Sequence, residues 1–390
     1  MRAVAGFVGI FVPVSIIAMK RLSLLLLLLC VSSAIPAQSP GYYLLEGEIG
    51  QHAACMEIAI YPALEAGLPE EIPPVAAHYY LLDECLPVEL YRSSRSGNFQ
   101  SLVLSTWLDQ GDSETFTGAF DGRSYTGMLA SEADTVAFHF TLSDRRGVER
   151  FLPFERHTIV TVESGQLEEA LEGTMQFRGF LPGDGALAGA LTALITGGGF
   201  TDFGAYADQQ LGLFEEGYEA EMTDRVEELD EQLAYTLNHQ YEYSVYPVLN
   251  TPDYLVMGFS TFRYTGGAHG MSSQHFYTYR KRDKKWLQLE DILDVGQEQA
   301  LNGLLDAEVR EQYGIEPDVK LNEDEYGIFI ADSITYSSNF ILSKQGITFH
   351  YGLYELTPYA YGYFRLFVPY EKLKAVLRPG FRYDSDSTAM

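Results

Sequence analysis

The sequence predicts an α+β protein, in which an N-terminal antiparallel β barrel or sandwich is followed by an α+β domain with an antiparallel sheet and packed helices. Two observations predict this class. Short runs rich in β-branched and aromatic residues recur between turn residues over residues 41–155, which is typical of antiparallel barrels and sandwiches. Helical periodicity appears at residues 214–240 and again at 296–314, between further strand-like runs, which indicates helices packed on strands.

The start of the chain predicts export. Residues 1–37 have the layout of a secretory signal peptide, because two basic residues precede a leucine-rich run and then small residues. Met19 is an alternative start of translation, and cleavage is expected after Ala34 or Ala37. Attachment of a lipid to Cys30 is an alternative that the preceding leucine disfavours. We therefore expect the mature protein in the periplasm, at the cell surface or outside the cell.

The chain is strongly acidic, with 54 Asp and Glu residues against 26 Lys and Arg residues. Residues 163–231 contain 16 acidic residues and two basic ones, which is half of the net charge of −28. Because no basic patch is evident, nucleic acid is not an expected partner. The acidic charge either keeps the protein soluble or attracts a cationic partner. No later segment is apolar over about 18 residues, so no membrane span is predicted in the mature chain.

Residues 38–155 are expected to form the β-rich domain. Asp121 and Gly122 are expected to supply the positive φ angles of a tight hairpin. Cys55 and Cys85 are the only cysteines after the signal peptide, so export predicts a disulfide between them. Two buried free thiols are the alternative. Seven strand-like runs are expected, at residues 55–61, 78–84, 86–92, 101–108, 114–120, 124–130 and 136–142.

Residues 156–380 are expected to form the α+β domain, and residues 381–390 a tail. A short helix flanked by glycines is expected within 183–200, and Gly314 is expected to end the helix of 296–314. The helix of 214–240 presents one apolar stripe at Met222, Val226, Leu229, Leu233 and Leu237. Strands are expected at 253–264, 274–280 and 363–370, a strand leading into a turn at 286–293, a hairpin at 340–356 turning at Gln345 and Gly346, and a short helix at 371–380.

Three separated motifs carry a resemblance to a known family. They are YTGGAHG at residues 264–270, the W-x-x-L-E-D-I-L run at 286–293, and GITFHYGLYELTPYAYGYFRLFVPYEKL at 346–373. Over roughly residues 155–378 the sequence resembles the extracellular domain of RsiV-type anti-sigma factors and the accessory domain of PdaC-type peptidoglycan deacetylases. The resemblance implies a non-catalytic exported domain, which in RsiV-type proteins binds lysozyme. Neither a sigma-binding segment nor a deacetylase domain is recognised, so neither activity is carried over.

The YTGGAHG run is the candidate site, and its chemistry is open between three interpretations. It could be a hairpin connection that needs glycine for positive φ, with His269 bonded to backbone. It could be a metal site in which His269 is joined by carboxylates or His350. It could be a ligand-binding loop together with nearby tyrosines. The candidate ligand-binding residues are Tyr264, Gly266, Gly267, His269, Glu355 and Tyr359.

Motifs that would indicate an enzyme are not found in the sequence. HExxH, the phosphate-binding loop and G-x-S-x-G are all missing, so we predict no catalytic residues, no metal and no cofactor. The sequence therefore predicts an exported, non-catalytic binding protein of the cell envelope. Its expected partner is a cationic protein such as lysozyme, or an envelope glycan such as a peptidoglycan fragment. The alternative is a metal-dependent envelope hydrolase that uses His269 and carboxylates.

Overall fold

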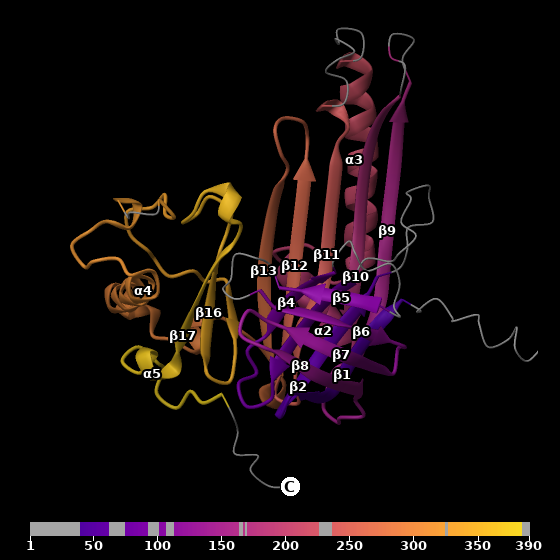
Figure 1. The fold of residues 1–390 in the computed structure, drawn as a ribbon. Coiled ribbons are helices and arrows are strands. Elements are labelled where there is room, and N and C mark those ends of the chain that lie inside the picture. The colour runs from indigo at the N-terminus through magenta and orange to yellow at the C-terminus, as the bar shows by residue number, and fades with distance from the viewer. Residues whose placement is uncertain are drawn as a thin grey trace, which may run out of the picture. The chain divides into compact units, whose positions relative to one another are not determined.

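Eight antiparallel strands close into a barrel at the N-terminal end of the described chain, as Figure 1 shows in indigo to magenta. The barrel closes because β1 pairs with β8 as well as with β2. This confirms the predicted antiparallel barrel. The strands are β1 (Gly41–Ile49), β2 (His52–Ile60), β3 (Val75–Leu81), β4 (Val88–Arg92), β5 (Leu102–Ser105), β6 (Thr115–Phe120), β7 (Ser124–Ala130) and β8 (Thr135–Leu142).

Apolar side chains fill the barrel interior, so it is a packed core. Phe116, Tyr125 and Phe138 lie at its centre and are fully buried. Tyr125 satisfies its hydroxyl by donating to the carbonyl of Leu102 at 3.0 Å. In the β6–β7 hairpin only Gly122 has a positive φ, of 83°, so the prediction for Asp121 is wrong. The Asp121 carboxylate instead accepts hydrogen bonds from the backbone of the turn.

The computed structural model describes residues 40–61, 75–92, 101–106, 113–163, 167, 170–225, 236–323 and 327–383. The predicted signal peptide and residues 384–390 of the predicted tail lie outside this part. By its internal contacts, the chain from Pro40 to Met390 forms one unit. Within the described residues, no helix is both long and apolar enough to cross a membrane.

A six-stranded sheet follows the barrel, with the order β14-β13-β12-β11-β10-β9. Its neighbouring strands are antiparallel except for β10 and β11, which run parallel. Two helices join this parallel pair, because parallel strands need a crossover connection. The elements are β9 (Phe151–Val162), β10 (Leu171–Pro182), α2 (Gly185–Ile195), α3 (Phe203–Arg225), β11 (Gln240–Asn250), β12 (Tyr254–Tyr264), β13 (Met271–Arg280) and β14 (Lys285–Leu287).

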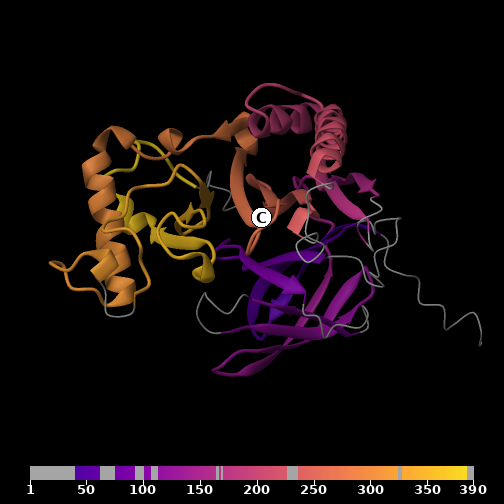
Figure 2. The ribbon, with the colours of Figure 1, turned by 90° about the horizontal axis from the view of Figure 1, so that it is seen from above.

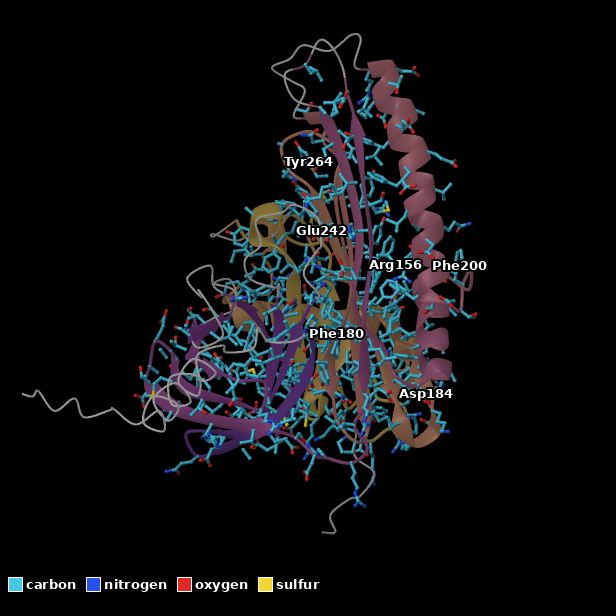
Figure 3. All side chains as sticks on the ribbon, turned by 90° about the vertical axis from the view of Figure 1, so that its right-hand side faces the viewer. Arg156, Phe180, Asp184, Phe200, Glu242 and Tyr264 are labelled. Carbon is cyan, nitrogen blue, oxygen red and sulfur yellow. The ribbon has the colours of Figure 1, made fainter. Side chains whose placement is uncertain are left out.

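The helices α2 and α3 cover one face of this sheet, as the views in Figures 2 and 3 show. Helix α3 starts at Phe203, earlier than the predicted Phe214, so its apolar stripe begins roughly five turns before Met222. Of the predicted stripe, Val226, Leu229 and Leu233 lie outside the described residues. The buried side chains of α3 are Phe203, Ala207, Leu211, Phe214, Tyr218 and Met222.

The barrel packs against the opposite face of the sheet, partly through apolar contacts. Phe180 of β10 is fully buried and lies against Tyr61 of the barrel, with ring centroids 5.4 Å apart. Figure 3 shows Phe180 on the barrel side and Phe200 on the α3 side. The sheet is therefore a middle layer, with helices on one face and the barrel on the other.

A buried polar cluster also joins the barrel to the sheet. The carboxylate of Glu57 in β2 accepts hydrogen bonds from the Tyr42 hydroxyl and from the backbone N–H of Asn250, both at 2.8 Å. Burial raises the pKa of Glu57 to about 7. Lys281 donates to the Asn250 side chain at 3.1 Å and to the carbonyl of Gly147 at 2.9 Å, and burial lowers its pKa to about 8.

The C-terminal part is a three-stranded antiparallel sheet with two helices. Helix α4 ends where the sequence predicts, because Gly314 takes a left-handed conformation with φ 66°. Helix α5 ends at Leu373, well before the predicted residue 380, and a short 3-10 turn at Tyr359–Tyr361 precedes the last strand. The elements are α4 (Glu298–Tyr313), β15 (Phe340–Leu342), β16 (Gly346–Tyr351), β17 (Phe364–Pro369) and α5 (Tyr370–Leu373).

Cys55 and Cys85 are both buried in the structure and no disulfide joins them, so the predicted bridge is not present. Cys85 sits just after β3 with a φ of 48°, and its thiol lies 3.5 Å from the carbonyl oxygen of Leu82. Burial raises the pKa of Cys55 to about 12. The alternative of two buried thiols therefore describes this structure better than the bridge.

Candidate functional site

The YTGGAHG run forms the connection between β12 and β13, as expected for a hairpin loop. Gly266 and Gly267 both have positive φ, at 94° and 93°, which confirms why glycine is needed there. At Gly266 a Cβ atom would also lie 2.5 Å from the carbonyl oxygen of Thr236, whereas at Gly267 it would meet open space. The Tyr264 hydroxyl donates to the carbonyl of Gly267 at 3.1 Å and holds the loop across its base.

His269 is exposed, but both of its ring nitrogens and one side of its ring contact protein atoms. Its Nδ1 lies 3.0 Å from the carbonyl oxygen of Gly270, and its Nε2 lies 3.4 Å from the Tyr354 hydroxyl. The ring stacks on Tyr359 with centroids 4.0 Å apart. Tyr359 also donates to the carbonyl of Gly270 at 3.0 Å. These contacts favour a structural role for His269, which fixes the loop against the segment before β17.

Glu355 and His350, the other residues considered for a site with this loop, have contacts with residues outside it. Glu355 accepts a hydrogen bond from the backbone N–H of Gly352 at 2.7 Å. His350 lies in β16 with its ring between Phe276 and Tyr363, and burial lowers its pKa to about 3. Across the described part of the chain, no three His, Cys, Asp or Glu residues meet in a group that could hold a metal ion.

A groove of about 520 Å³ lies beside the loop, on the face of the six-stranded sheet that is opposite α3. We call it the polar groove. Tyr359 lines it, so the groove and the glycine loop share one wall. Other lining side chains are Glu89 and Tyr91 of β4, Glu242 and Ser244 of β11, Ser260 of β12, Ser272 and Gln274 of β13, and Tyr361, Tyr363 and Arg365 around the start of β17.

The charges in the polar groove are paired with each other. Arg365 donates to the Glu89 carboxylate at 2.5 Å and to the Gln274 side chain at 3.2 Å. Burial acts to lower the pKa of Arg365, but the Glu89 carboxylate outweighs it and the pKa rises. For Glu89 burial acts to raise the pKa, and Arg365 and His78 outweigh it, so the pKa falls. Both groups are therefore ionised at neutral pH, and the groove floor has no net charge from this pair.

Hydroxyl and amide groups line the sheet side of the polar groove, and tyrosine rings line the other side. Such a lining offers hydrogen-bond donors and acceptors together with flat apolar surface. Tyr361 keeps 43% of its surface exposed, so its ring is available to a ligand. The arrangement can bind a neutral molecule that has many hydroxyl groups and apolar faces.

Apart from Tyr359, the residues of the polar groove were not predicted, although the sequence contains a signal for them. Glu242 and Ser244 alternate in β11 with Tyr243 and Val245, which pack under the helices. Because successive strand residues point to opposite faces, the polar set marks the face opposite the helices. Figure 3 shows Glu242 on the side of the sheet away from α3. The contribution of Glu89 and Arg365 depends on contacts between β4 and β17, which no local pattern indicates.

Comparison with known proteins gives a family for the C-terminal part only. Residues 290–371 match the family model described as "Protein of unknown function (DUF3298)". A crystal structure of a DUF3298 family member from Bacteroides fragilis has 21% identity and a TM-score of 0.48, covering 58% of this chain and 94% of that one. A DUF3298 family protein from Pseudomonas aeruginosa has 17% identity and a TM-score of 0.40, with 59% and 95% covered. No curated protein matches the sequence. Residues 290–371, which supply the 359–365 side of the polar groove, are thus similar to the DUF3298 family.

Proposed function

We propose that this protein is an exported, non-catalytic binding protein of the cell envelope and that its polar groove binds a glycan. The observation that carries the proposal is the lining of the groove. Tyrosine rings at Tyr359 and Tyr361 face a sheet that presents Ser260 and Gln274. Sugar rings combine apolar C–H faces with hydroxyl edges, so they can pack on the tyrosines and hydrogen-bond to the sheet.

The charge of the groove supports a neutral ligand. Because Glu89 and Arg365 form an ion pair with each other, neither is left to attract a charged group. Arg178 likewise lies 3.5 Å from Glu242 at the far side of the groove. A peptidoglycan fragment supplies neutral N-acetylated sugars, whose amide groups add a donor and an acceptor to the hydroxyls.

A titration of the purified chain with an N-acetylglucosamine tetrasaccharide tests the proposal. Binding is expected for the wild type, and Tyr361→Ala should weaken it at least about fivefold, as truncation of an aromatic contact does at binding sites. Met128→Ala is the matched control, because Met128 is 45% exposed on the outer wall of the barrel. No binding, or equal binding by both variants, would reject the groove as a glycan site.

A cationic protein is the second candidate partner, because the outer side of α3 is acidic and exposed. Its exposed acidic side chains are Asp208, Glu215, Glu216, Glu219, Glu221 and Asp224. Potentials of one sign attract partners of the opposite sign, and salt screens this attraction. Lysozyme is the probe. If the double variant Glu216→Lys and Glu219→Lys loses lysozyme binding while its tetrasaccharide binding is unchanged, this second function is favoured.

A further inference from the structure

A second cavity, of about 500 Å³, lies on the other face of β13 from the polar groove. Ser273, His275 and Tyr277 of β13 line it, whereas Ser272 lines the polar groove. Because successive strand residues point to opposite faces, the two cavities belong to opposite faces of the sheet. Tyr277 also packs in the core under the helices, which places this cavity on the helix face. We call it the β13 cleft.

Asn339 joins the two sides of the β13 cleft. Its side-chain amide donates to the carbonyl of Gln274 at 2.7 Å and accepts from the backbone N–H of Phe276 at 2.9 Å. The amide therefore pairs with β13 as the backbone of a neighbouring strand would, and Asn339 directly precedes β15. The cleft thus lies between strands that are fixed to each other.

Part of the lining of the β13 cleft is apolar. Trp286 of β14, Leu194 at the end of α2 and Phe340 of β15 all line it. The Trp286 ring is half-buried and packs against Tyr279, with ring centroids 5.1 Å apart. Such a lining can hold an alkyl chain, and the face of a tryptophan ring also attracts cations.

Glu355 gives the β13 cleft a negative charge. Its exposed carboxylate accepts from the backbone N–H of Gly352 at 2.7 Å, and among the described residues it takes part in no ion pair. No Lys or Arg of the described chain lines the cleft. Burial lowers the pKa of His350 to about 3 and raises that of Tyr277 to about 12, so both are neutral at pH 7. The Glu355 carboxylate is therefore available to a cation.

We propose that the β13 cleft binds the side chain of a lysine in a peptide, with its ammonium at Glu355 and its alkyl stem against Trp286 and Leu194. A lysine side chain packs its methylene groups on apolar surface and keeps its charged end near water. Ser338 and Gln288 also line the cleft and offer hydrogen bonds to a peptide backbone. The net charge of −28 favours the approach of a cationic peptide. This inference adds a second ligand on another face and does not depend on the glycan function.

The fluorescence of Trp286 can report binding, because the chain has only two tryptophans. In the Trp107→Phe variant Trp286 is the only one, and the whole chain is titrated at pH 8, where histidine is ordinarily neutral. Acetyl-Ala-Lys-Ala-amide should change the emission in a saturable way. The norleucine analogue has the alkyl stem without the ammonium, and glucosamine has the ammonium without the stem. Both should bind about tenfold or more weakly than the lysine peptide, because each lacks one of the two contacts.

Glu355→Gln keeps the size of the side chain and removes its charge. It should weaken binding of the lysine peptide about tenfold, with an unchanged melting temperature, because a charged hydrogen bond is lost at an exposed position. Glu371→Gln is the matched control, because the Glu371 side chain is 84% exposed on α5 and does not line the cleft. Tetrasaccharide binding should be the same in both variants.

Three results would overturn the inference. One is a lysine peptide that changes neither the Trp286 emission nor the heat in a calorimetric titration of the wild type. Another is equal affinity for the lysine and norleucine peptides, or an unchanged affinity in Glu355→Gln, which would remove the role of the charge. The third is glucosamine that binds as tightly as the lysine peptide, which would remove the assignment to a peptide side chain. Each of these results leaves the glycan function of the polar groove untouched.

Discussion

The two faces of the six-stranded sheet differ in what their side chains do. On the helix face Phe177 and Tyr243 stack with centroids 4.3 Å apart, in a core that also holds Val245 and Met257. On the opposite face Glu242 and Ser244, which flank Tyr243 in β11, are polar and line the polar groove. Because strand residues alternate between faces, one set of strands can carry both the stability and the proposed recognition. Substitutions on the two faces should therefore separate stability from binding.

The largest expected effect is on the helix face. Phe177→Ala removes a fully buried ring and should lower the free energy of unfolding by about 3–5 kcal/mol. Ser260→Ala, on the groove face, should change it by less than about 0.5 kcal/mol, as surface substitutions do. Urea denaturation of both variants measures the difference. Similar losses of unfolding free energy in the two variants would contradict the idea that the helix face provides stability and the groove face provides binding.

The buried joint between the barrel and the groove face should make stability depend on pH. Burial raises the pKa of Glu57 from 4.5 to about 7. Between these values the folded state binds the proton and the unfolded state does not, so stability falls as the pH rises. A full shift of this size corresponds to roughly 3 kcal/mol between pH 4.5 and 7. Glu57→Gln should remove that part of the change of unfolding free energy with pH, measured by denaturation at several pH values. The same dependence on pH in the variant would disprove the role of Glu57.

The glycine loop, which joins β12 to β13 beside the groove, should lose stability when its glycines are replaced. Gly266→Val places a β-branched residue at positive φ and against the Thr236 carbonyl, whereas Gly267→Val has the positive φ alone. Gly267→Val should cost about 1–3 kcal/mol, and Gly266→Val should cost more. Thermal melts give the ranking. An unchanged melting temperature for Gly267→Val would reject the loop as a connection shaped by its glycines.

The smallest expected effect is that of His269→Ala. Loss of its hydrogen bond to Gly270 should cost about 1 kcal/mol of stability. Tetrasaccharide binding should change little, because the ring of His269 lies behind Tyr359 rather than among the residues that line the groove. A normal melting temperature with lost binding would instead make His269 a ligand-binding residue.

The sequence predicts the elements better than it predicts the site. Period-two runs locate the barrel strands, and Gly314 marks the end of α4, because both signals are local. The start of α3 at Phe203 is missed, since the expected stripe begins at Met222 and ignores the earlier aromatic residues. The Glu89–Arg365 pair joins residues 276 positions apart, so it depends on tertiary contacts that no short motif contains.

The candidate loop is a part of the molecule whose conformation the sequence does indicate. Gly267 has a positive φ, and His269 contacts the Gly270 carbonyl and stacks on Tyr359, as the hairpin interpretation expects, while their role in ligand binding stays a prediction. Only Tyr359, among the predicted ligand-binding residues, lines the polar groove. Glycine and histidine are conspicuous in a sequence, whereas serine and glutamine at alternate strand positions are common and easily overlooked.

A crystal structure of the chain soaked with the N-acetylglucosamine tetrasaccharide tests the central claim most directly. The account predicts a sugar ring against Tyr361 and sugar oxygens within hydrogen-bonding distance of Ser260 or Gln274. Sugar bound at the glycine loop or elsewhere on the surface, with the polar groove empty at saturating concentration, would contradict it.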